Sequence, residues 1–69
     1  MALAHLDDPD VYDMLSLADR KIATHADIAA TYGATVHDMH LLVRGRLRAA
    51  VFRAYHRDKF YAERAARTA

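Results

Sequence analysis

The sequence contains no cysteine and, within 69 residues, only one proline and two glycines. The absence of cysteine excludes disulfides and thiolate metal sites, and it is compatible with the reducing cytoplasm in which we expect the protein to act. With so few helix-breaking residues and fifteen alanines, the chain is predicted to be all-α. Its length suits one small domain with a modest core.

Long apolar runs are also absent. No stretch approaches the roughly 20 residues that a membrane-spanning helix needs, so no membrane association is expected. The first ten residues, MALAHLDDPD, have neither the basic start nor the apolar centre of a secretory signal.

The two signs of charge are separated along the chain: the first half has few basic residues and the second half has few acidic ones, although the net charge is only +1. Residues 1–38 hold seven Asp against one Arg and one Lys, a net charge of −5. Residues 39–69 hold seven Arg and one Lys against one Asp and one Glu, a net charge of +6. A basic half of this kind indicates a polyanionic partner. The alternative is a solvated basic helix that pairs with the acidic half of its own chain.

Helical periodicity predicts a first helix at about residues 9–22. Asp8 is the expected N-cap, and Pro9 suits the first helical position. Arg20 and Lys21 are expected in the last turn, where positive charge favours the helix dipole. The expected buried face consists of Val11, Met14, Leu15, Ala18 and Ile22.

A short second helix is predicted between Thr24 and Gly33. Thr24 is its expected N-cap, and Asp27, three residues later, can reach back toward the cap as in a capping box. Gly33 is expected to end the helix, because glycine tolerates the left-handed conformation that closes one.

The third helix is expected to begin after Thr35, which stands in the same relation to Asp38. We predict one continuous helix over residues 36–66, bent at Gly45, because the following Arg-Leu-Arg contains no capping side chain. At about 46 Å it would be too long for two short helices to cover. The overhang either folds back on the first helix or pairs with a second chain. The apolar stripe of this helix is Val36, Met39, Leu42, Val43, Leu47, Ala50, Val51 and Ala54.

Residues 25–44 resemble the helix-turn-helix family of DNA-binding proteins. In that family a small residue lies four positions before a glycine in the turn, and Ala29 and Gly33 have this spacing. Two steeply crossing helices need a small residue at their contact and a residue with positive φ between them. Apolar residues stand at the flanking positions Ile28, Tyr32, Ala34, Met39 and Leu42.

The segment after Gly33 is also similar to the last helix of sigma-factor-type and response-regulator DNA-binding domains. The same pattern occurs in small phage repressors, excisionases and antitoxins. The resemblance implies a three-helix domain with a core at residues 9–54 and a C-terminal helical arm at residues 46–66. It further implies a small bacterial or phage transcription regulator, repressor-like, that binds double-stranded DNA as a homodimer.

By the same resemblance, the third helix enters the major groove. Arg44 is then expected to contact guanine or, alternatively, a phosphate, and Asp38 either accepts from cytosine or only caps the helix with Thr35. Arg53 and Arg57 would add non-specific attraction. The implied DNA-binding residues are Thr24, His25, Thr35, His37, Asp38, His40, Leu41, Arg44, Arg46 and Arg48.

The aromatic and apolar residues of the arm are expected to form the dimer contact. Stacking of the aromatic side chains on single-stranded bases is the alternative. The expected dimerisation residues are Val51, Phe52, Tyr55, Phe60 and Tyr61.

The sequence gives no pattern of an enzyme or of a cofactor or small-molecule site. His37 and His40 are spaced to share a metal on a helix, but two imidazoles are too few for a closed zinc site. No nucleophile, phosphate loop or pair of acids has a supporting frame. Two other functions stay open: a protein-interaction module whose basic helix docks on an acidic surface, and a DNA-architectural protein of the excisionase type.

Overall fold

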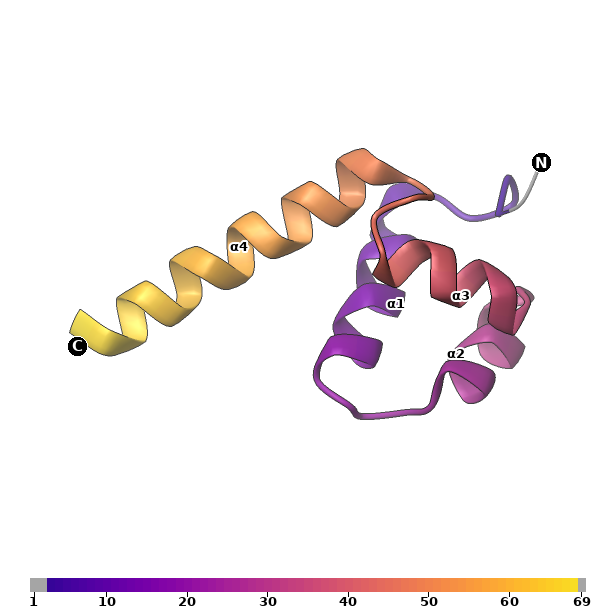
Figure 1. Ribbon diagram of the computed structural model, residues 1–69, viewed down its shortest axis with the longest axis horizontal. Coiled ribbons are helices and arrows are strands. Elements are labelled where there is room, and N and C mark those ends of the chain that lie inside the picture. The colour runs from indigo at the N-terminus through magenta and orange to yellow at the C-terminus, as the bar shows by residue number, and fades with distance from the viewer. Residues whose placement is uncertain (1–2, 69) are drawn as a thin grey trace.

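The computed structural model describes residues 3–68, which form four α-helices joined by short turns (Figure 1). These residues contain no strand, so the predicted all-α class is confirmed. The predicted number of three helices is wrong, because the expected last helix is divided in two. The helices are α1 (Asp8–Asp19), α2 (His25–Tyr32), α3 (Val36–Val43) and α4 (Ala49–Thr68).

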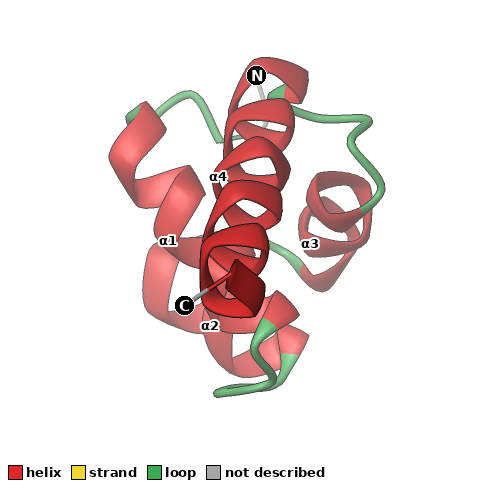
Figure 2. Cartoon of the chain, turned by 90° about the vertical axis from the view of Figure 1, so that its left-hand side faces the viewer, coloured by secondary structure: helices red, strands yellow, loops and turns green. Residues whose placement is uncertain are grey.

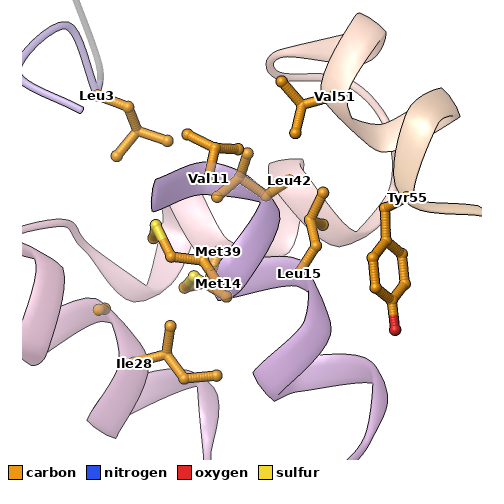
Figure 3. Packing of buried hydrophobic residues seen from close by; sticks show 10 residues of the cluster. Leu3, Val11, Met14, Leu15, Ile28, Met39, Leu42, Val51 and Tyr55 are labelled. Carbon is orange, nitrogen blue, oxygen red and sulfur yellow. The ribbon is translucent and has the colours of Figure 1, made fainter. Parts of the chain in front are cut away.

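The core lies around α1, which contacts each of the other three helices. Its centre consists of Met14, Met39 and Leu42, which point toward one another and are fully buried (Figure 3). Full burial of an apolar side chain of this size stabilises a fold by about 1.5–3 kcal/mol, so loss of any one of the three would be felt strongly in a domain this small. The buried residues are Leu3, Val11, Met14, Leu15, Ile28, Ala29, Met39, Leu42, Val51 and Tyr55.

Helix α1 begins one residue earlier than expected. Its N-cap is Asp7, whose Oδ1 accepts from the backbone N–H of Asp10 at 3.1 Å. Asp8 is therefore the first helical residue and not the cap. Pro9 is the second helical residue and not, as predicted, the first, but it still lies in the first turn, where its missing N–H has no partner to lose.

The end of α1 differs more. Lys21 adopts a left-handed φ of 56° directly after the cap residue Arg20. Its N–H donates to the Ala18 carbonyl at 3.2 Å, and that of Ile22 donates to the Leu17 carbonyl at 3.0 Å, which is the hydrogen-bond pair of a Schellman ending. The predicted end at residue 22 is thus wrong, and Ile22 is exposed instead of lying on the buried face.

The same ending interrupts the predicted long helix after α3. Gly45 has a φ of 73°, and its N–H donates to the Leu42 carbonyl at 3.1 Å. The N–H of Arg46 donates to the Leu41 carbonyl at 2.9 Å. These two bonds satisfy carbonyls at the end of α3 and turn the chain away from its axis. Gly45 ends one helix and does not bend a continuous one.

Arg48 starts α4 without a conventional capping side chain. It has a φ of 52°, and its carbonyl accepts from the N–H groups of Val51 and Phe52. Its guanidinium donates to the Leu6 carbonyl at 2.7 Å and forms an ion pair with Asp8 at 3.1 Å. Arg48 thereby ties the start of α4 to the segment before α1.

The first half of α4 packs along α1. The Tyr12 hydroxyl donates to Asp58 Oδ2 at 2.7 Å, and the Tyr55 hydroxyl donates to Asp19 Oδ2 at 2.8 Å. Lys59 forms an ion pair with the same Asp19 oxygen at 2.9 Å. The sequence left two alternatives for the C-terminal part of the predicted long helix, packing on the first helix or on a second chain. The first half of α4 packs on the first helix.

This packing revises the expected dimer contact. Val51 and Tyr55 are 7% and 6% exposed and belong to the core of their own chain. Phe52 is half-buried against that core. Phe60 and Tyr61 lie further along α4 and are 58% and 60% exposed. Only the last two of the expected dimerisation residues thus remain accessible.

The segment before α1 also contributes to the core, which the sequence analysis did not anticipate. Leu3 is buried, and the His5 Nε2 atom lies 2.9 Å from the Tyr32 carbonyl at the end of α2. These contacts close the end of the domain opposite to the projecting part of α4 (Figure 1).

Viewed along α4, the helix crosses in front of the bundle between α1 and α3 (Figure 2). Its C-terminal part extends beyond the other helices, so the molecule measures 41 × 22 × 18 Å. No helix among residues 3–68 combines the length and apolarity needed to cross a membrane.

Candidate functional site

The candidate site is built on the corner between α2 and α3. Gly33 turns the chain with a φ of 67°, and the N–H of Ala34 donates to the Ala29 carbonyl at 2.8 Å. The methyl group of Ala29 is buried at this corner. The residues predicted to form the interior of the two-helix unit are Ile28, Ala29, Met39 and Leu42, all buried, with Tyr32 partly buried against them.

Both helices of the corner begin at the predicted threonines. The Thr24 Oγ1 atom accepts from the N–H of Asp27 at 3.1 Å. At α3 the cap is reciprocal: Thr35 Oγ1 accepts from the N–H of Asp38 at 3.0 Å, and Asp38 Oδ2 accepts from the N–H of Thr35 at 3.2 Å. The Asp38 carboxylate is therefore engaged in the cap, which favours the capping role over contact with a base.

The side of α3 that faces away from the core presents a continuous strip of side chains, here called the α3 face. Its members lie at i, i+4 and i+8 and at a neighbouring i, i+4 pair, so they occupy one arc of the helix. All are exposed except Leu41, which is half-buried. The α3 face consists of Val36, His37, His40, Leu41 and Arg44.

Sequence reasoning placed Val36 in the apolar stripe, and this was wrong. Val36 is 43% exposed and stands one turn before His40 on the α3 face. The signal that could have identified it is its register: Met39 and Leu42 define the buried side, and Val36 lies about 60° from the nearer of them around the helix.

The start of α2 lies beside the α3 face. The rings of His25 and His40 meet edge to face, with centroids 5.4 Å apart. Thr24, which precedes His25, is exposed. The fold thus brings together on one surface the N-terminus of α2 and the central part of α3.

The expected arginines divide into two groups. Arg44 and Arg46 are exposed at the end of α3 and extend the candidate site with positive charge. The guanidinium of Arg48 contacts the Leu6 carbonyl and Asp8 and so has a structural role. Arg48 is therefore no longer counted among the expected DNA-binding residues. Among the described residues 3–68, the ion pairs of Arg48 with Asp8 and of Lys59 with Asp19 join the basic half to the acidic half, in partial agreement with the alternative of internal pairing.

The arrangement suits recognition of a polar surface. The α3 face offers two imidazoles, one guanidinium and two branched apolar side chains; all of them are exposed except that of Leu41, which is half-buried. Within residues 3–68 no group of three or more His, Asp or Glu side chains is placed to hold a metal ion.

Comparisons with protein-family models, with curated proteins and with solved structures gave no match to this chain.

Proposed function

We propose that the protein binds double-stranded DNA sequence-specifically through the α3 face, as a small repressor-like transcription regulator of the helix-turn-helix type. The observation that carries this proposal is the division of α3. Met39 and Leu42 anchor one side of the helix in the core, while the opposite side presents a continuous strip of three hydrogen-bond donors and two apolar side chains. A helix held in this way can enter the major groove of DNA, which is about 12 Å wide.

The chemistry of the α3 face matches the edges of base pairs. A guanidinium such as that of Arg44 donates two hydrogen bonds to O6 and N7 of guanine. The imidazoles of His37 and His40 donate to bases or phosphates, and Val36 contacts the methyl group of thymine. The α3 face therefore contains both polar and apolar groups for discriminating bases.

Contacts to phosphates would position the helix. Thr24 and the first N–H groups of α2 lie beside the α3 face, and the N-terminus of a helix attracts anions. The exposed arginines Arg46 and Arg53 add attraction that does not depend on sequence. A bacterial or phage cytoplasm is the setting that this proposal implies.

Two substitutions separate base reading from general attraction. Arg44→Ala is expected to reduce affinity for a selected site about 10- to 100-fold and to relax the preference for one base pair, since a bidentate contact discriminates by ~1–3 kcal/mol. Arg53→Ala is the matched control, which removes the same group from α4. It should weaken all duplexes alike and lower the slope of log affinity against log salt by about 0.9.

Fluorescence anisotropy with labelled duplexes at several salt concentrations measures both effects. Absence of duplex binding at ~50 mM salt, where phosphate contacts are strongest, would contradict the proposal and favour a protein-interaction module. Strong bending of every bound duplex without preference for a sequence would favour the architectural alternative.

A further inference from the structure

An open groove runs between α1 and α4 on the side of the molecule formed by their first turns. Its volume is about 430 Å³. The alanines of α4 leave it shallow and apolar, and two carboxylates of α1 stand at its edge. The residues that line it are Asp8, Pro9, Tyr12, Asp13, Ala50, Val51 and Ala54.

The stripe of α4 that borders this groove continues past it to the end of the helix. Ala50, Ala54, Arg57, Tyr61 and Ala65 follow one another at intervals of three or four residues and therefore share one side of α4. Tyr61 is 60% exposed, and the C-terminal part of α4 extends beyond the other helices (Figure 1). The stripe thus has small alanine side chains beside the groove and an exposed aromatic ring in its distal part.

We propose that this groove binds the distal half of α4 from a second copy of the chain, with the two α4 helices antiparallel. The same surface would then serve both copies, as a two-fold symmetric contact requires. This inference rests on α1 and α4 and does not depend on DNA binding by α3.

Shape sets the register of the two helices. In an antiparallel pair centred between residues 57 and 58, Tyr61 of the partner subunit lies opposite Ala54, and Ala65 of the partner subunit lies opposite Ala50. A large ring then faces a small side chain twice, once in each half of the dimer. The Tyr61 ring would fill the space between Ala54, Pro9 and Tyr12 that the groove leaves open.

Charge supports the same register. The edge of the groove carries the exposed carboxylates of Asp13 and Asp8, the latter already paired with Arg48, whereas residues 57–67 of α4 carry three Arg and one Lys against one Asp and one Glu. With Tyr61 opposite Ala54, Arg57 of the partner subunit approaches Asp13; in a single chain this arginine lies 3.4 Å from Asp58. A parallel arrangement would instead place the basic distal halves of the two α4 helices beside each other, which like-charge repulsion disfavours.

Disulfide capture tests the register directly, since the chain has no cysteine of its own. In the Ala50→Cys/Ala65→Cys double variant, which keeps the Tyr61 ring, air oxidation should give a covalent dimer on a non-reducing gel. An intrachain bridge is ruled out, because positions fifteen apart on a helix are about 22 Å apart and a disulfide needs Cα atoms within about 7 Å. The control is Ala50→Cys/Ala66→Cys, whose second cysteine lies about 100° further around α4 and should remain unpaired.

A second measurement does not depend on cysteine. Sedimentation of the wild-type chain should give a dimer whose dissociation constant rises about thirtyfold in Tyr61→Ala, the size of effect seen when a central aromatic residue is removed from an interface. Phe60→Ala removes a ring of similar exposure that is attached about 100° around α4 from Tyr61 and touches the Tyr61 ring only edge to face, so it should change the constant less than about threefold. Circular dichroism checks that each variant stays helical.

Three results would overturn the proposal: a wild-type chain that remains monomeric at ~100 μM, equal effects of Tyr61→Ala and Phe60→Ala, or equal crosslinking in the two cysteine variants. None of these measurements uses DNA, so failure here leaves the α3 proposal intact. Failure of the DNA experiments likewise leaves the dimer in place.

Discussion

Residues with left-handed backbone conformation determine where the helices of this protein begin and end. Lys21, Gly33 and Gly45 follow the first three helices, and Arg48 precedes the fourth. For residues other than glycine this conformation costs about 1–2 kcal/mol, so Lys21 and Arg48 keep it because the hydrogen bonds around them require it. These four positions divide a predominantly helical sequence into four short elements.

Gly45 should be the less replaceable of the two glycines. A Cβ atom there would lie 2.9 Å from the Phe52 ring, whereas at Gly33 the nearest atom is His5 Nε2 at 3.3 Å, which also contacts the Tyr32 carbonyl. Gly33→Ala is expected to cost about 1 kcal/mol, mainly from backbone strain, and Gly45→Ala about 2–3 kcal/mol because the Phe52 ring must also shift. Urea denaturation followed by circular dichroism measures both. Equal costs would show that the contact with Phe52 is unimportant.

At the scale of elements, the sequence correctly predicted those helix starts and ends that are formed by residues close together in the chain. The caps at Thr24 and Thr35 and the end of α2 at Gly33 were correct, because each is made by side chains or backbone within four residues. The break between α3 and α4 was missed. Its second half depends on Arg48, whose partner Leu6 lies 42 positions away in the sequence, and no local pattern indicates such a contact.

The candidate site shows the same limit. Most of the α3 face could be predicted, since helical register alone determines which residues share a side. Val36 was misplaced because its apolar character was given more weight than its register, which sets it about 60° around the helix from Met39. Arg48 was assigned to DNA because its charge is evident in the sequence, whereas the Asp8 carboxylate that pairs with it becomes a neighbour only after folding.

The contact between α1 and α4 should make stability depend on pH at both extremes. The Lys59 ammonium, and after it the Tyr55 hydroxyl, lower the pKa of Asp19. The stability that this contact contributes is therefore present above the ordinary carboxyl pKa of ~4 and is lost as pH falls through the lower pKa of the folded state.

On the alkaline side, hydrogen bonding to Asp58 raises the pKa of Tyr12, burial raises the pKa of Tyr55, and hydrogen bonding to Asp19 raises the pKa of Lys59. Their contributions are present below pH ~10 and are lost above it.

Thermal melts across pH 2–12 check this expectation. The melting temperature should be nearly constant between about pH 5 and 9 and should fall on both sides. Asp19→Asn should lower the plateau and make the acid decline shallower, because it removes the carboxylate whose protonation breaks the contact with Lys59. Tyr12→Phe should affect the alkaline side and leave the acid side unchanged. An acid decline of equal steepness in Asp19→Asn would assign that decline to other carboxylates.

At the scale of the whole molecule, the two halves of α4 have different surroundings. The first half completes the core through Val51 and Tyr55, and the distal half extends beyond the bundle with Phe60 and Tyr61 exposed. A 69-residue chain has little core to spare, so an antiparallel pair of these arms would also reinforce the fold. Two α3 faces related by a two-fold axis would then read half-sites of opposite orientation, so the bound DNA should be palindromic.

The central claim is that the α3 face recognises a particular DNA sequence. Selection of bound molecules from random duplex DNA, followed by sequencing, tests this most directly. Base reading by two α3 faces predicts an enriched motif with inverted half-sites and a guanine preference that disappears at one position of each half-site in Arg44→Ala while persisting in Arg53→Ala. A wild-type pool that stays as random as the input at ~50 mM salt, where phosphate contacts are strongest, would contradict it.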